Sequence, residues 1–143
     1  MEDLKIEGSL KTFAVECNAS TGRLVISGRS IPENSFDFFD PIFAWLNQYV
    51  NEPQPLTELN LYIEYFNTAS SKCLLDIFRL LEGLGSNDQY KVAINWYYEE
   101  EDEDMEYAGE DFKAVVNIPF TIQAVEQFYV IFLFFYLLDF MSC

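Results

Sequence analysis

The sequence predicts a single α/β domain in which a mixed β-sheet is covered by about three helices. The chain has 143 residues, half of them apolar, which is enough for one buried core. Segments in which apolar residues alternate are interleaved with segments in which they recur at helical spacing. Strands that alternate with helices usually pair in parallel through right-handed crossovers, so we expect the later strands to be parallel.

An antiparallel hairpin is expected first, over residues 12–27. The segment Thr12 to Cys17 alternates apolar and polar residues, and residues 18–22 have the composition of a turn. The chain then returns along Arg23 to Ser27, and Gly28 is expected to end this strand. We expect the hairpin to form the start of the sheet.

A helix is predicted next. Ser30 is a candidate N-cap, Pro32 suits a first turn, and apolar residues recur at helical spacing from Phe36 to Val50. Pro41 lies inside this pattern and predicts a kink, or a division into a short and a long piece.

The remaining elements alternate. A strand is predicted over residues 59–65, and the small polar residues 67–71 are typical of a helix start. The apolar stripe behind them runs over residues 74–84. A strand over residues 90–98, a third helix around residues 105–116 and a short strand over residues 120–125 complete the domain. In the strand over 90–98, Trp96 is predicted to be core, while Tyr97 and Tyr98 fit either core or a contact surface.

Charge and composition exclude several functions. Twenty-four acidic residues against 8 basic ones give a formal charge of −16, which repels nucleic acids and anionic lipids. The absence of histidine removes the commonest general base and metal ligand, and we expect no cofactor, no metal and no catalytic residue. The three cysteines are far apart and indicate reduced thiols in a cytoplasmic protein, with Cys73 packing inside a helix. The N-terminus lacks the apolar stretch of a signal peptide.

The corner at residues 64–72 carries the most informative residues. Thr68 lies where a helix is predicted to begin, so free backbone N–H groups and the positive end of the helix dipole would stabilise a phosphate on its hydroxyl. Lys72, one turn later, would add a charge-assisted contact. The alternative is a simple helix cap in which Thr68 or Asn67 accepts a backbone hydrogen bond, and physical chemistry alone favours this cap.

Through this corner and five further motifs, the chain resembles the SiaC family of bacterial regulatory phosphoproteins from about Leu4 to Glu126. Six motifs together carry the resemblance: Ile26-Ser27-Gly28, Pro32-Glu33-Asn34, Trp45-Leu46, the run from Tyr65 to Lys72, Asn95-Trp96-Tyr97-Tyr98, and the acidic Glu101 to Met105 leading to Ala108-Gly109. We therefore divide the chain into a SiaC-like domain at 1–126 and an apolar C-terminal extension at 127–143.

The resemblance implies a partner-switching protein whose fold is similar to the STAS fold of anti-sigma-factor antagonists. It implies that a dedicated serine/threonine kinase phosphorylates Thr68 and that a metal-dependent serine/threonine phosphatase reverses this. The unphosphorylated form would bind and activate a diguanylate cyclase, raising cyclic di-GMP and favouring biofilm. The corner residues expected to contact partners are Tyr65, Phe66, Asn67, Ser70, Ser71 and Lys72.

The acidic run from Glu99 to Asp104 leaves alternatives open. As a metal site it would support a small carboxylate-based, metal-dependent enzyme, but it lacks the spacing of an EF-hand loop. A solvated helix start is the simplest interpretation, and a docking patch for a basic partner is the second. An adaptor without a switch is a further alternative.

The extension departs from the family. Phe128 to Leu138 is uninterrupted apolar sequence, shorter than the roughly 20 residues of a spanning helix and without a basic anchor after Lys113. We expect additional core or a self-association surface at 128–143 rather than a membrane anchor.

Overall fold

The strands and helices of the chain follow one another in the predicted alternation. The computed structural model describes residues 1–129, 137–138 and 141. Its elements are β1 (Leu4–Ile6), β2 (Ala14–Asn18), β3 (Arg23–Ser30), α1 (Ser35–Tyr49), β4 (Leu56–Phe66), α2 (Thr68–Gly85), β5 (Lys91–Glu99), α3 (Glu103–Val115) and β6 (Phe120–Val125).

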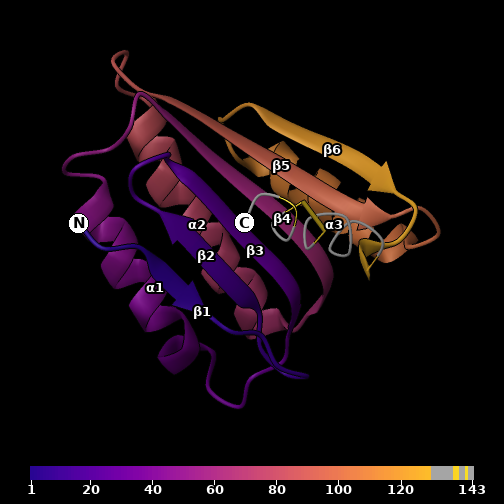
Figure 1. The fold of residues 1–143 in the computed structure, drawn as a ribbon. Helices are drawn as coiled ribbons and strands as arrows, with labels where there is room; N and C mark the ends of the chain where they lie inside the picture. Colours follow the sequence, from indigo (N-terminus) through magenta and orange to yellow (C-terminus); the bar gives the residue numbers. More distant parts are fainter. Residues whose placement is uncertain (130–136, 139–140, 142–143) are drawn as a thin grey trace.

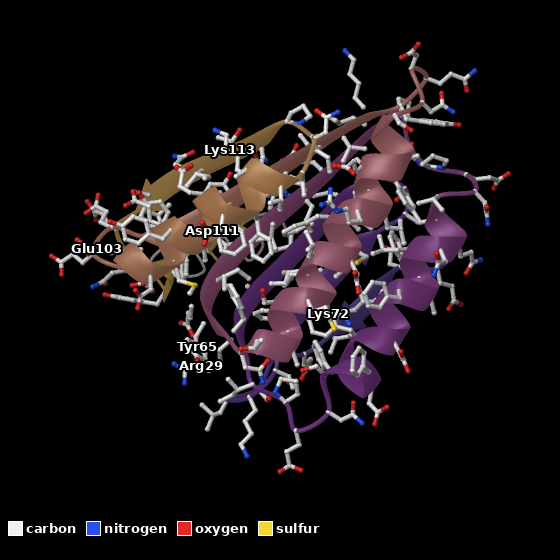
Figure 2. All side chains as sticks on the ribbon, turned by 180° about the vertical axis from the view of Figure 1, so that it is seen from behind. Arg29, Tyr65, Lys72, Glu103, Asp111 and Lys113 are labelled. Atoms are coloured by element: carbon white, nitrogen blue, oxygen red, sulfur yellow. The ribbon has the colours of Figure 1, made fainter. Side chains whose placement is uncertain are left out.

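The strands form one mixed sheet in the order of the sequence, β1-β2-β3-β4-β5-β6. The first three strands pair antiparallel, whereas β3 to β6 pair in parallel through the crossover helices. Figure 1 shows the twisted sheet with the helices behind it, and the reversed view of Figure 2 shows the helices in front. The helices α1, α2 and α3 therefore cover one face of the sheet and leave the other face without them.

Alternation along the strands explains which residues form the core. In β4, Leu59, Leu61 and Ile63 are fully buried and belong to the main core cluster. In β5, the same alternation buries Trp96, which confirms its predicted place in the core. The buried Phe78 of α2 completes an aromatic cluster with Trp96 and the two phenylalanines Phe112 and Phe120.

The end of the hairpin differs from the prediction. Gly28 does not end β3: it adopts a φ of +96°, the register shifts between Gly28 and Arg29, and the strand continues to Ser30. This bulge needs the left-handed conformation that glycine adopts without steric cost. A short edge strand, β1, also pairs with β2 and carries too few residues for a recognisable pattern.

The start of the first helix also differs. Asn34 is the N-cap of α1, and its side chain accepts a hydrogen bond from the backbone N–H of Asp37, so Ser30 is not the cap. Pro41 does not divide the helix, which runs without interruption to Tyr49. Pro41 lacks an N–H for the carbonyl of residue 37, but both residues are exposed, so water can satisfy that carbonyl.

The later elements agree with the prediction within a few residues, and Cys73 is buried on the packed side of α2 as expected. At the C-terminus, residues 130–136, 139–140 and 142–143 lie outside the described residues, so most of the predicted apolar run stays a prediction. Phe128 is described and buried. Among the described residues, no helix is both long and apolar enough to cross a membrane.

Candidate phosphorylation and docking site

The candidate site lies at the carboxyl ends of the parallel strands. At this edge β3 ends at Ser30, β4 at Phe66 and β5 at Glu99, and each is followed by a loop into the next helix. Figure 2 shows Arg29 and Tyr65 side by side at this edge, with Lys72 on the first part of α2 and Glu103 at the start of α3. The predicted corner and the acidic run therefore lie on the same edge of the sheet.

Asn67 is the N-cap of α2. Its backbone is extended, and its side-chain oxygen accepts a hydrogen bond of 2.9 Å from the backbone N–H of Ser70. Its own N–H donates to the carbonyl of Ser30 at 2.9 Å, which fixes the corner to the end of β3. Of the two cap residues considered from sequence, the structure selects Asn67, so the Thr68 hydroxyl is not needed as a cap.

Thr68 is the first residue of α2, and its side chain is exposed. The first turn of α2 contains no acidic residue, so the positive end of its dipole is not compensated there. Lys72 is exposed one turn later; ion pairs within the described ranges join Lys5 to Glu16, Arg29 to Glu64 and Arg79 to Glu82, and none uses Lys72. Helix N–H groups and a lysine without such a pair are therefore both available to an anion on Thr68.

Ser70 lies behind this surface and is fully buried. Its hydroxyl is 2.7 Å from the hydroxyl of Ser30 and 3.4 Å from that of Ser35, which begins α1. This buried group of hydroxyls, which we call the serine cluster, joins β3 and the first turns of α1 and α2. Ser70 is thus a positioning residue in this conformation and is not on the surface that a partner would touch.

The other corner residues divide between surface and core. Tyr65 is 50% exposed and pairs in register with Arg29, whose guanidinium lies 3.7 Å from the Glu64 carboxylate. Phe66 is partly buried and packs against the rings of Trp96 and Phe112. Ser71 is half-buried. Tyr65, Thr68 and Lys72 are therefore the most accessible side chains of the predicted set.

An open groove beside the corner is lined mainly by carboxylates. We call the six acidic residues that line it the acidic rim: Glu64, Glu99, Glu100, Glu101, Asp102 and Glu126. Partial burial raises the pKa of Glu99, and the nearby carboxylates of Glu64 and Asp102 raise it further. Of the described residues that line the groove, Arg29 alone is basic, so the rim is a site of concentrated negative potential.

Within the described ranges, no three Asp, Glu, His or Cys side chains are arranged to hold a metal ion. Asp102 instead caps α3 by accepting a hydrogen bond from the backbone N–H of Met105, and Glu103 and Asp104 occupy the first turn. This is the solvated helix start expected from the sequence. The metal-dependent alternative therefore gains no support from the geometry.

The two tyrosines left open by the sequence have different environments. The Tyr98 ring is buried, and its hydroxyl donates to a carboxylate oxygen of Glu106 at 2.5 Å, which raises the pKa of Tyr98. Tyr97 is half-buried on the face of the sheet without helices and stacks on Tyr62 with ring centroids 4.6 Å apart. Neither ring is placed at the Thr68 corner.

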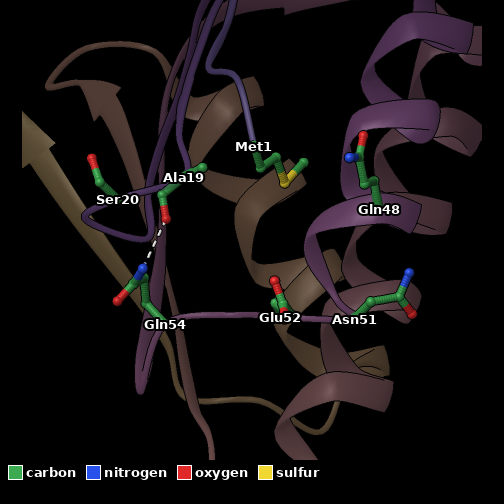
Figure 3. A pocket seen from close by; sticks show the side chains of 7 residues that line it. All are labelled: Met1, Ala19, Ser20, Gln48, Asn51, Glu52 and Gln54. Carbon is green, nitrogen blue, oxygen red and sulfur yellow. Dashed lines mark hydrogen bonds between the residues drawn. The ribbon is translucent and has the colours of Figure 1, made fainter.

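A second hollow lies at the opposite edge of the sheet, between the turn after β2 and the end of α1 (Figure 3). Two of the residues that line it are joined by a hydrogen bond of 2.9 Å, which the Gln54 side-chain amide donates to the carbonyl of Ala19. Among the described residues that line it, Glu52 is the one with an ionisable side chain, so these residues offer no combination of groups suited to catalysis.

Sequence reasoning missed Ser30 and Ser35 as supports of the corner. Ser30 was considered only as a helix cap and Ser35 was not considered, because no local pattern shows that the end of β3 lies beside the start of α2. Only the parallel pairing of β3 with β4, in which Ser30 lies opposite Phe66, brings the hydroxyls together.

The fold and the corner define a class of protein: an α/β regulatory domain with an exposed threonine at a helix N-terminus and no recognisable catalytic constellation among its described residues. The model of the SiaC family of regulatory phosphoproteins matches residues 6–125. The chain belongs to this family.

Known relatives agree with this assignment. An uncharacterized protein of Pseudomonas aeruginosa strain UCBPP-PA14 is 34% identical over 127 residues, which cover 89% of this chain and 100% of the relative. SiaC of Pseudomonas aeruginosa has a similar structure, with a TM-score of 0.79 and 34% identity over 87% of this chain and 100% of that one.

A chain in the crystal structure of the diguanylate cyclase SiaD in complex with its activator SiaC, also from Pseudomonas aeruginosa, is similar too. The TM-score is 0.81, with 34% identity over 86% of this chain and 100% of that one. The similarity thus includes a structure in which a family member is bound to its target.

Proposed function

We propose that this chain is a non-enzymatic regulator that binds and activates a diguanylate cyclase, and that phosphorylation of Thr68 prevents this binding. The observation that carries the proposal is the exposed Thr68 at the uncompensated start of α2 in a member of the SiaC family. The complex of SiaC with SiaD supports the choice of a diguanylate cyclase as partner. A dedicated serine/threonine kinase and a metal-dependent phosphatase would set the phosphorylation state, in the cytoplasm.

The switch would act through local electrostatics. A phosphate on Thr68 adds about −1.5 to −2 charges at pH 7, which the N–H groups of α2 and Lys72 can hold in place. The same phosphate must be desolvated if a partner covers the corner, and this opposes docking. Exposed Tyr65 beside the corner supplies the aromatic contact area that interfaces commonly use. The unmodified corner therefore favours docking and the phosphorylated corner opposes it.

The acidic rim would complete the docking surface. It lies beside Tyr65 and Arg29 on the same edge of the sheet, and its six carboxylates favour a partner with a basic surface. We propose that this attraction steers the cyclase to the acidic rim, whereas the opposition to docking comes from the desolvation of a Thr68 phosphate beneath the covering partner. Raised cyclic di-GMP and biofilm formation would follow from cyclase activation.

The proposal is tested by replacing Thr68 and measuring cyclase capture and activity. Immobilised wild type, Thr68→Ala and Thr68→Asp are exposed to lysate of the native cells, and bound proteins are identified by mass spectrometry. Cyclic di-GMP synthesis by the purified cyclase is then measured with each variant. Thr68→Ala should retain capture and activation in all growth conditions, and Thr68→Asp should weaken both.

Two controls sharpen the test. Ser86→Asp places a carboxylate at the exposed far end of α2 and should leave capture unchanged. Capture of wild type should decrease at high ionic strength if the acidic rim steers the partner. If Thr68→Asp and Thr68→Ala activate the cyclase equally, and peptide mapping finds no phosphate on Thr68 in cells, the switch is refuted and an unswitched adaptor remains.

A further inference from the structure

The face of the sheet that the helices leave uncovered carries an aromatic pair. Tyr62 of β4 and Tyr97 of β5 lie opposite each other in register, with nearly parallel rings whose centroids are 4.6 Å apart. We call this pair the tyrosine platform. Its members alternate with Leu61 and Trp96, which belong to the core on the helix side, so the platform lies on the opposite face.

The platform is covered although none of α1, α2 and α3 lies on this face. Tyr62 is only 5% exposed, and the Phe128 ring lies edge-to-face against it, with centroids 6.0 Å apart and an interplanar angle of 87°. Phe128 itself is 2% exposed. Phe128 follows β6 by three residues, so the C-terminal extension begins by crossing back onto the helix-free face.

Polar groups next to the platform agree with a cover. Asn60 lies two residues before Tyr62 on the same face and is 1% exposed. Its side-chain oxygen accepts a hydrogen bond of 3.0 Å from Asn95, but its amide nitrogen is buried and has no acceptor among the described residues. The cost of burying this donor is one that water could relieve if it reached the site, so the burial of Asn60 agrees with a covered face.

We propose that the C-terminal extension is held within the same chain on the sheet face opposite α1, α2 and α3, and that Phe128, seated on the tyrosine platform, is its anchor. The occupant is the same chain because its own Phe128 is already seated there, and because the apolar sequence continues from Phe128 to Leu138. The family model ends at residue 125, so the cover is an addition to the family domain. It leaves Thr68, on the helix side, accessible, and it does not depend on the proposed switch.

Hydrogen–deuterium exchange on the full chain tests this proposal, with Phe128→Ala compared with Tyr129→Ala. Tyr129 is the adjacent residue and is 68% exposed, which makes it a matched control. Phe128→Ala should raise exchange in the β4 and β5 peptides that contain Tyr62 and Tyr97 by at least about tenfold, and Tyr129→Ala should not. Phe128→Leu, which retains apolar volume, should restore part of the protection, and circular dichroism checks that each variant is folded.

Other occupants give different results. Light scattering and exchange over a dilution series identify a second copy, because protection would then disappear as a dimer dissociates. Addition of vesicles of phosphatidylcholine and phosphatidylglycerol identifies a membrane, because protection would then need the vesicles. Either result overturns the proposal, as does equal protection in wild type and Phe128→Ala. Concentration-independent protection that only the Phe128 substitutions reduce supports it.

Discussion

Thr68 and Ser70 are two positions apart, yet one is exposed and the other is fully buried. Because α2 turns about 100° per residue, Thr68 faces solvent while Ser70 faces β3 and α1. The exposed hydroxyl can be modified without disturbing the core. The buried hydroxyl holds the corner in place through Ser30. Thr68 is thus the residue open to modification, and Ser70, two positions later, supports the corner.

Ser70→Ala should destabilise the domain. The substitution removes a hydroxyl bonded at 2.7 Å to Ser30 and leaves that buried group without its partner, at an expected cost of about 1–3 kcal/mol in the free energy of unfolding. Urea titrations followed by tryptophan fluorescence measure the change. Ser71→Ala and Thr68→Ala are the controls and should shift stability by less than about 0.5 kcal/mol. Equal losses in all three variants would contradict the role assigned to the serine cluster.

Cys17 should make stability fall at alkaline pH. Burial, with smaller contributions from Asp3 and Glu16, raises the pKa of its thiol from the ordinary 9.0 to about 12. The unfolded chain therefore ionises first as the pH rises above 9, so this contribution to stability is complete below pH 9 and declines toward pH 12, by at most about 1.4 kcal/mol per pH unit.

Unfolding curves of wild type and Cys17→Ala at several values between pH 8 and pH 10.5 isolate this dependence, as the variant should lack it. Alkylation mapped by mass spectrometry gives a second measure, because native Cys17 should react far more slowly than the unfolded thiol. Rapid alkylation of Cys17 under native conditions would show that the thiol is not buried.

At the scale of the element, the N-terminus of α2 should depend on its cap. Asn67→Ala removes the side-chain acceptor of the Ser70 N–H and should cost about 0.5–2 kcal/mol of unfolding free energy. Asn67→Asp keeps an acceptor and adds a charge that the dipole favours, so its stability should be close to that of wild type. Thermal unfolding by circular dichroism measures both. A loss in Asn67→Asp as large as in Asn67→Ala would refute this capping role.

Two helical glycines should respond in opposite directions to alanine. A Cβ on Gly109 of α3 would lie 2.6 Å from Cδ1 of Trp96, so Gly109→Ala should cost about 1–3 kcal/mol through overpacking. A Cβ on exposed Gly83 of α2 would meet nothing within 4 Å, so Gly83→Ala should gain about 0.5–1 kcal/mol from helix propensity. Differential scanning calorimetry tests the contrast, and the same sign for both changes would contradict the tight packing of α3 on β5.

The elements also show what sequence patterns can predict. The apolar periodicity of α2 and β5 is strong, and both elements form within a few residues of their predicted bounds. The predicted division of α1 at Pro41 was wrong. Proline breaks a helix partly because the carbonyl four residues earlier loses its hydrogen-bond donor, but here that carbonyl is exposed and water can satisfy it. Asn34 was overlooked as a cap because Ser30 also had a suitable side chain, and only the extension of β3 past Gly28 excludes Ser30.

At the scale of the whole molecule, the order of the strands places the functional groups. Parallel pairing of β3 to β6 puts Arg29, Tyr65 and the start of the acidic rim on one edge, although they are far apart in the sequence. Alternating strands and helices made the parallel sheet predictable, and the small polar residues 67–71 made the start of α2 predictable, while the role of Thr68 stays a prediction. The serine cluster and the tyrosine platform were not predictable, since each depends on side chains from elements that only tertiary structure brings together.

The two faces of the sheet have different roles in this account. The proposed switch lies on the helix side and the carboxyl edge, whereas the face opposite α1, α2 and α3 carries the tyrosine platform and Phe128. A modification at Thr68 should therefore change partner binding without changing the protection of β4 and β5. Because the two faces are separate, a measurement of cyclase binding needs to vary only the phosphorylation state of Thr68.

The most direct test is the affinity of the cyclase for the phosphorylated and unphosphorylated chain. Phosphothreonine is installed at position 68 by genetic code expansion, intact mass confirms its stoichiometry, and calorimetry with the purified cyclase gives both dissociation constants. Our account predicts binding at least about 100-fold weaker for the phosphorylated chain, equivalent to about 2.7 kcal/mol. Equal dissociation constants for the two forms would contradict it.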